Sequence, residues 1–226
     1  MALVDNLIEH WSLDNTLNGS LGAINLTAVG TAFSYGTGVL GQDLVAPGVA
    51  GRYKTFPYNS ALTAGTIAFS YKATGDGTGG FHRIIGKTQV GVTDVLNIGL
   101  ENFGRQPVFV LSDTQLIRPA VDTFTRGTWY NHVITWNGTT AIWYVNGTSS
   151  FSAASTDALD ANTTVFTICG WAGNTTQQPA GEIDHIAIWS RALSSTEVTQ
   201  WNNGNSLLAY PFVSANKVGL MTMGVG

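Results

Sequence analysis

Alternating hydrophobic and polar positions recur along the chain and predict many short strands. Apolar residues alternate in 67–71, and further apolar runs follow at 81–85, 95–100 and 108–111, each bounded by Gly, Asp or Pro. Alternation with a period of two is typical of half-buried strands, while Gly, Asp and Pro favour turns. The pattern therefore predicts an all-β protein.

The clearest pattern lies in residues 128–151. Thr128–Trp136 has the composition of a strand and is followed by Asn137-Gly138, an apolar segment at 141–145 and a second Asn-Gly pair at 146–147. Asn-Gly pairs adopt the positive φ angles of tight hairpin turns. Three strands joined by two hairpins, a β-meander, are predicted here.

Two later segments, 165–169 and 182–189, also have strand patterns. Strict alternation in the second places Ile183, His185, Ala187 and Trp189 on one face and Glu182, Asp184, Ile186 and Ile188 on the other. Apolar residues on both faces imply burial on both sides, as in a sandwich of two sheets.

A short helix is predicted after these strands. Ser194-Ser-Thr-Glu197 has the sequence of a capping box, Leu193 is placed to pack onto Val198, and Gly204 is placed to end the helix. Val198 and Trp201 would then face the sandwich.

Charged residues make up only 11% of the 226 residues, against about a quarter in an ordinary soluble domain. Neutral polar residues replace them, with 28 Thr, 16 Asn, 15 Ser and 27 Gly. The 44% hydrophobic content argues against disorder, and no apolar run approaches the roughly 18 residues of a membrane helix. The net charge of −4, with scattered Lys and Arg, argues against a nucleic-acid partner. Membrane insertion is likewise not expected.

Three ordered motifs resemble one known family. Trp129–Gly138, Ile142–Gly147 and Gly181–Ser194 are similar to segments of laminin-G-like, concanavalin-A-like domains, and Leu7–Asp14 is similar to their first strand. The resemblance implies a two-sheet antiparallel jelly-roll sandwich with one short C-terminal helix. We expect this laminin-G-like domain to span residues 1–212, followed by an apolar C-terminal extension at 213–226.

Some members of this family hold calcium, and Asp76 lies in a Gly-rich loop where it would contribute a ligand. This chain has Asn137, Asn146 and His185 where members often carry acidic residues. Calcium needs about six to eight oxygen ligands, and no Asp-x-Asp run supplies them. We therefore expect no cofactor and no metal site, with calcium at Asp76 as the alternative.

Glucanases of this family carry a Glu-x-Asp-x-Glu type strand, and Glu182-Ile-Asp184 matches its first half. The partner acid expected at or next to position 186 is absent, since the chain has Ile186-Ala187 there. Retaining hydrolysis needs two carboxyl groups about 5 Å apart. We therefore expect no enzymatic activity. The remaining reactive side chains are interpreted as packed or hydrogen-bonded core residues: His10, His82, His132, His185 and Cys169.

Binding chemistry is expected in the loop that begins at Trp171. An indole beside the amides of Asn174 and Gln177 can stack on a sugar ring and donate to its hydroxyls. Together with Asp76, these residues form the candidate ligand site. The alternative is that Trp171 closes the end of the sandwich.

The N-terminus has no secretion-signal pattern, so we expect synthesis in the cytoplasm. Low charge and the apolar tail suggest subunit contacts, with Val218, Leu220, Met221 and Met223 as contact residues in a homo-oligomer or larger assembly. The leading hypothesis is a non-catalytic bacteriophage virion component, a capsid decoration or tail-associated adhesin at the virion surface that contacts cell-surface glycan. A stand-alone carbohydrate-binding module is the alternative, and a glycoside hydrolase is the third reading.

Overall fold

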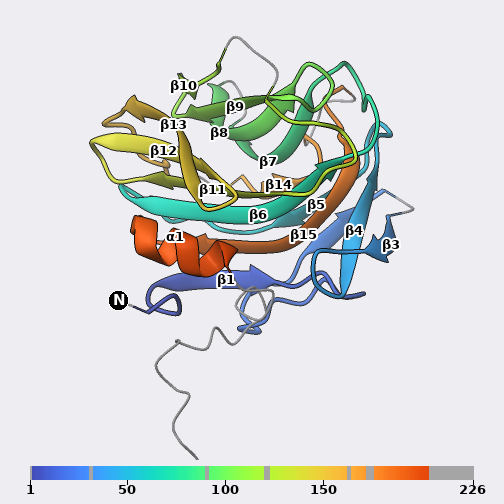
Figure 1. Ribbon diagram of the computed structural model, residues 1–226, viewed down its shortest axis with the longest axis horizontal. Helices are drawn as coiled ribbons and strands as arrows, with labels where there is room; N and C mark the ends of the chain where they lie inside the picture. Colours follow the sequence, from blue (N-terminus) through green and yellow to red (C-terminus); the bar gives the residue numbers. More distant parts are fainter. Residues whose placement is uncertain are drawn as a thin grey trace, which may run out of the picture.

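The protein is a sandwich of two antiparallel sheets with one helix packed on the outside, in the part of the chain that is described (Figure 1). This computed structural model describes residues 2–30, 33–89, 92–119, 123–161, 164–171 and 176–203, and side chains are not described at 88–89 and 92–94. The expected all-β jelly-roll sandwich is confirmed. The expected contact residues Val218, Leu220, Met221 and Met223, and the 213–226 extension, lie outside the described residues.

The first sheet has the strand order β13–β12–β11–β6–β15–β4–β3, and β1 also pairs with β15. The predicted β-meander forms its β11–β12–β13 edge, and the turn residue Asn146 has the positive φ of 49° that an Asn-Gly hairpin requires. Its strands are β1 (Leu7–Trp11), β3 (Ser34–Thr37), β4 (Gln42–Pro47), β6 (Gly65–Ala73), β11 (Tyr130–Trp136), β12 (Thr140–Val145), β13 (Thr148–Ala154) and β15 (Ala180–Trp189).

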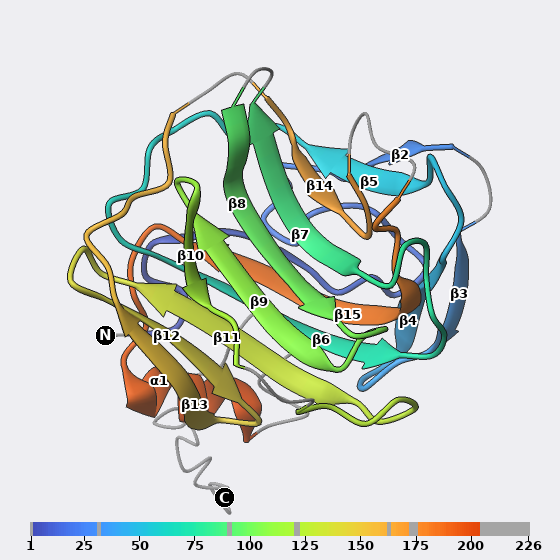
Figure 2. The ribbon, with the colours of Figure 1, turned by 90° about the horizontal axis from the view of Figure 1, so that it is seen from above.

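The second sheet has the order β10–β9–β8–β7–β14–β5–β2 and covers the first, as seen from above in Figure 2. Its long central strands coincide with three of the apolar runs in the sequence. Its strands are β2 (Thr27–Val29), β5 (Tyr53–Phe56), β7 (His82–Gln89), β8 (Val92–Glu101), β9 (Gln106–Leu111), β10 (Thr114–Ile117) and β14 (Phe166–Ile168).

The main core lies between the two sheets and is rich in aromatic rings. Trp11 packs on Phe56 with ring centroids 4.9 Å apart, and Phe56 stacks on Phe166 at 4.7 Å. Five tryptophans are fully buried and fill the interior: Trp11, Trp136, Trp143, Trp189 and Trp201.

The histidines and the cysteine are buried as expected. Each imidazole makes a hydrogen bond, for example between His132 Nδ1 and the indole N–H of Trp143 at 3.1 Å. Burial raises the pKa of Cys169 to about 12 and lowers the pKa of His132 to about 3, so both groups are neutral at pH 7.

The strict alternation predicted for 182–189 is wrong. A register shift between Asp184 and Ala187 and a positive φ of 47° at His185 form a bulge in β15. Ile183 therefore shares the main core with Ile186 and Ile188, and not with Ala187 and Trp189. A bulge inserts one extra residue, so the side-chain faces change over at that point.

Helix α1 (Ser195–Asn202) covers part of the outer face of the first sheet. Its capping box is present as predicted, with the Ser194 side chain accepting from the Glu197 backbone N–H. Val198 and Trp201 are buried against a second apolar cluster, together with Leu193. The helix is capped at Asn203, and the predicted terminator Gly204 lies outside the described residues.

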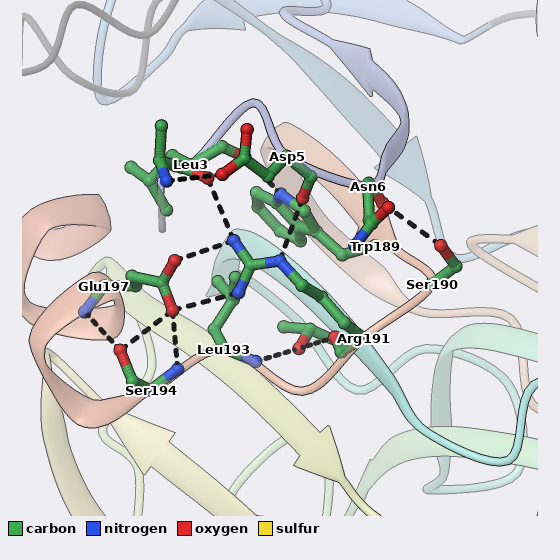
Figure 3. Close-up of polar contacts among 11 residues, drawn as sticks. Leu3, Asp5, Asn6, Trp189, Ser190, Arg191, Leu193, Ser194 and Glu197 are labelled. Atoms are coloured by element: carbon green, nitrogen blue, oxygen red, sulfur yellow. Dashed lines mark hydrogen bonds and ion pairs between the residues drawn. The ribbon is translucent and has the colours of Figure 1, made fainter.

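Arg191 ties this helix to the N-terminus (Figure 3). Its Nη2 lies 2.7 Å from Glu197 Oε1, its Nε donates to the Asp5 carbonyl, and Nη2 also donates to the Ala2 carbonyl. Burial alone would raise the pKa of Glu197, but hydrogen bonds from Arg191 and Ser194 outweigh it and hold that pKa below its ordinary value.

Candidate functional site

Four polar segments meet at one end of the sandwich and form the candidate site. They are 74–81 between β6 and β7, 102–105 between β8 and β9, 123–129 before β11, and 176–179 before β15. Backbone hydrogen bonds join them: Phe103 N donates to Gly80 O at 2.9 Å and Thr78 N to Gln178 O at 2.9 Å. Because the segments hold one another, their side chains are presented from a fixed frame.

An open depression of about 680 Å³ lies among three of these segments. Phe103 is 44% exposed at its edge, and Arg126 lies over the Phe103 ring with its guanidinium carbon 5.7 Å from the ring centroid. Arg126 also pairs with Asp76. The depression is lined by Asp76, Phe103, Arg105, Thr123, Phe124, Thr125 and Arg126.

The predicted residues Trp171 and Gln177 are brought together by Arg83, which was not among the predicted site residues. The guanidinium carbon of Arg83 lies 4.5 Å from the centroid of the Trp171 ring, and its Nε donates to Gln177 Oε1 at 3.1 Å. Arg83 is 1% exposed, whereas Trp171 is half-buried. Arg83 lies in a strand pattern like any other residue there, so nothing in the sequence distinguished it.

Asp76 belongs to the depression and not to this second cluster, although the two adjoin through the 74–81 loop. The Thr78 hydroxyl in that loop donates to Gln178 Oε1 at 2.7 Å. Asn174 lies outside the described residues. Three of the four predicted ligand residues therefore lie at the same end of the fold, as parts of two neighbouring clusters.

Glu182 and Asp184 are on the outer face of β15. Asp184 is buried and accepts from the backbone N–H groups of Val39, Leu40 and His185. It thereby fixes the loop that contains Val39 and Leu40. Burial, opposed by these hydrogen bonds, raises the pKa of Asp184 to about 7.

Glu182 has a carboxyl neighbour that the sequence did not reveal. Asp43 on β4 lies near Glu182, and this neighbouring carboxyl group helps to raise the pKa of Asp43. Asp43 Oδ2 is buried without a hydrogen-bond partner among the described residues, and Glu182 pairs with Lys72.

Within the described ranges, no group of three or more His, Cys, Asp or Glu side chains is arranged to hold a metal ion. Across those same residues, no helix is long and apolar enough to cross a membrane.

A family model for the concanavalin A-like lectin/glucanases superfamily matches residues 50–199. The chain belongs to this superfamily. The matched range includes the loops of the depression, Trp171 and both carboxyl groups of β15. A search among curated proteins gives no match.

Solved structures with the same fold include both catalytic proteins and binding domains. Domain 4 of AbnA, an extracellular arabinanase from Geobacillus stearothermophilus solved with arabinotriose, is 17% identical with a TM-score of 0.64, covering 86% of this chain and 97% of that one. The binding domain of Paraclostridial Mosquitocidal Protein 1 is 16% identical with a TM-score of 0.70, covering 88% of this chain and 52% of that one. Trypanosoma rangeli sialidase is 14% identical with a TM-score of 0.67.

This chain spans about half of the mosquitocidal binding domain. The sialidase match covers 91% of this chain but only 34% of the sialidase. At these identities the likeness shows the fold alone. The fold thus occurs as a part of hydrolase chains and in binding domains.

Proposed function

We propose that this protein is a non-catalytic glycan-binding domain whose binding surface is the loop end of the sandwich. The observation that carries the proposal is the depression in which the exposed Phe103 ring lies beside the Asp76–Arg126 pair. Sugars are recognised by an aromatic surface against their C–H faces and by polar groups that bond their hydroxyls.

The volume of about 680 Å³ is in the range of ligand sites and suits a short oligosaccharide. The interlocked backbone of the four segments reduces the ordering cost of binding. The arabinanase domain of the same fold, solved with arabinotriose, supports arabino-oligosaccharides as the first ligands to test. Trp171, held on Arg83, offers a second aromatic surface next to this depression.

A glycan array that includes arabinotriose tests this proposal. Phe103→Ala removes the exposed ring and should weaken binding about tenfold, which equals about 1.4 kcal/mol. Leu21→Ala is the matched control, since Leu21 is similarly exposed at 40% and lies in the loop held by Glu9. An array without any hit, or Phe103→Ala binding as tightly as the wild type, would refute the proposal.

The non-catalytic role has its own test. The wild type and Glu182→Gln are incubated with arabinan and β-glucan, and released sugar is measured. We expect no turnover from either protein, because β15 has Ile186-Ala187 where the second acid of a glucanase strand would be. Turnover by the wild type that disappears in Glu182→Gln would show an enzyme.

We further propose that the domain acts in many copies, as a virion component of a bacteriophage, in the form of a capsid decoration or tail-associated adhesin made in the host cytoplasm. The low charge of 11% supports subunit contacts, since charged residues are depleted at interface centres. Many copies would add weak glycan contacts into firm attachment. A strict monomer in light scattering at high concentration would count against this placement.

A further inference from the structure

The loops of the proposed site rest on one buried imidazole, that of His82 at the start of β7. The ring points between the two sheets and is 0% exposed. Its Nδ1 is hydrogen-bonded to the Tyr71 hydroxyl of β6 at 3.0 Å. His82 thus joins the two sheets directly beneath the candidate site.

The two edges of this ring touch the two loops that carry the key side chains of the depression. A Cβ at Gly77, one residue after Asp76, would lie 3.0 Å from Cδ2 and Nε2 of the ring. A Cβ at Gly104, one residue after Phe103, would lie 2.9 Å from Cε1 and Nδ1. Both glycines also have positive φ, at 63° and 87°, so no other residue fits either position without strain.

The hydrogen-bond partners indicate which form of the imidazole fits. The Tyr71 hydroxyl is the hydrogen-bond partner of Nδ1, whereas Nε2, on the edge next to Gly77, is buried and has no hydrogen-bond partner in the described part of the chain. An imidazolium carries a proton on both ring nitrogens, and the proton on Nε2 would have no acceptor at this position within the described ranges. The neutral imidazole is therefore the form that matches this environment.

We propose that neutral His82 is the positioning residue that holds the Asp76 and Phe103 loops together, and that its protonation in acid opens the binding surface. The inference rests on the proposed function only for what these loops bind. The loop arrangement itself follows from the contacts of the ring.

The charges around the ring support this proposal. Burial is the main cause that lowers the pKa of His82 to about 4; the charge of Arg126 lowers it further, while Asp76 acts in the opposite direction. The ring faces Tyr71 of β6, and burial raises the pKa of Tyr71 well above its ordinary value. The residue paired with His82 on the neighbouring strand β8 is the uncharged Leu100. The neutral ring thus persists through mildly acidic pH, and the loops should stay closed until about pH 5.

Hydrogen exchange with mass spectrometry tests the loops without any ligand. In the full-length wild type, we expect protection of 74–81 and 101–105 to fall at least tenfold between pH 5.5 and 3.5, after correction for intrinsic rates, while β11 stays protected. In His82→Gln, which keeps a neutral acceptor for Tyr71 and does not titrate, the two loops should show no such fall. Equal falls in both proteins, or a wild-type fall shared by β11, would overturn the proposal.

A second measurement needs no variant to fold. The carbon shifts of the His82 ring in the wild type should show a neutral imidazole at pH 5.5 that titrates near pH 4. Titration near the ordinary value of 6.5 would overturn the proposal. If the loops respond to acid as expected but the glycan array shows no hit, the proposed function fails and the positioning role of His82 stands. If the protein binds a glycan but the loops do not respond to acid, the proposed function stands and the role of His82 fails.

Discussion

Replacing Asp43 with asparagine should stabilise the protein at neutral pH, although it alters a fully buried hydrogen-bonded side chain. Asp43 is 0% exposed on β4, and its Oδ1 accepts from the Gly36 N–H at 2.8 Å. Its Oδ2 is buried with no hydrogen-bond partner among the residues that are described, and the nearby carboxyl of Glu182 disfavours a negative charge on Asp43. In the asparagine variant, Oδ1 still accepts from Gly36, and the side chain is uncharged at every pH.

The magnitude follows from proton linkage. Burial first, and then the neighbouring Glu182, raise the pKa of Asp43 from 3.8 to about 6, against the N–H of Gly36 and the charge of Lys72. At about 1.4 kcal/mol per pH unit, this rise corresponds to at most about 3 kcal/mol. The Glu182 side chain is 18% exposed, so solvent screens the pair, and we expect about 1–2 kcal/mol.

The sign is set by which state holds the proton more tightly. The folded state binds it more tightly, so the stabilising contribution of Asp43 is complete below about pH 3.8 and is lost as pH rises to about 6. The two proteins should therefore have similar stability at pH 4, and Asp43→Asn should be more stable above pH 6. The difference between the proteins isolates Asp43, since Asp184 titrates in both.

Urea denaturation at pH 4, 5, 6 and 7.5 measures this difference as a change in the free energy of unfolding. Asp76→Asn is the control, because its carboxylate is exposed and its loss should change the free energy of unfolding by less than about 0.5 kcal/mol. A buried, charged Asp43 does not destabilise the fold if Asp43→Asn is less stable than the wild type at pH 7.5, or if the difference does not grow between pH 4 and 6.

Three further predictions concern the rest of the fold. Arg191→Ala should lower the free energy of unfolding in urea by about 3 kcal/mol, because Glu197 is left buried without its ion-pair partner. Since the pairing lowers the pKa of Glu197, this loss of stability should shrink as pH falls below 4.5, and a loss that does not depend on pH would contradict the prediction. Gly65→Ala should lower the free energy of unfolding by about 2–3 kcal/mol, because the added Cβ would lie 2.2 Å from the Trp136 ring. Gly22→Ala is the control: its Cβ would have nothing of the described chain within 4 Å, so it should cost only the strain of the positive φ, and equal losses in the two variants would contradict the clash at Gly65. Removing residues 213–226 should reduce assembly in light scattering, and an unchanged mass and melting temperature would reject the tail as a contact.

The sequence by itself determined those elements whose signals are local. The two Asn-Gly pairs mark the turns of the β11–β12–β13 meander. Asn146 and Gly147 both have positive φ, as a two-residue hairpin turn requires, whereas in the first pair only Gly138 does and the loop is longer. The Ser194–Glu197 capping box similarly marks the start of α1. Trp201 and Val198 follow at helical spacing, so their burial against the sheet was predictable.

The bulge at His185 and the two site clusters were decided by tertiary structure. Alternation in 182–189 assumes an uninterrupted ladder, and only pairing of β15 with β6 on one side and with β4 and β1 on the other shows where one residue is extra. Arg83 contacts Trp171 and Gln177, which lie 88 and 94 positions further along the chain. Such contacts leave no periodic pattern in a single sequence.

The same reason explains the acid pair. A search along β15 for a partner to Glu182 finds none, yet Asp43 approaches from a strand 139 positions earlier because β4 lies beside β15. Sequence determined that this chain folds as a sandwich with polar loops, since strand and turn preferences act over a few residues. Sheet order alone decided which loops meet around His82 and which carboxyl groups lie near one another, because these depend on neighbours that the chain brings together only on folding.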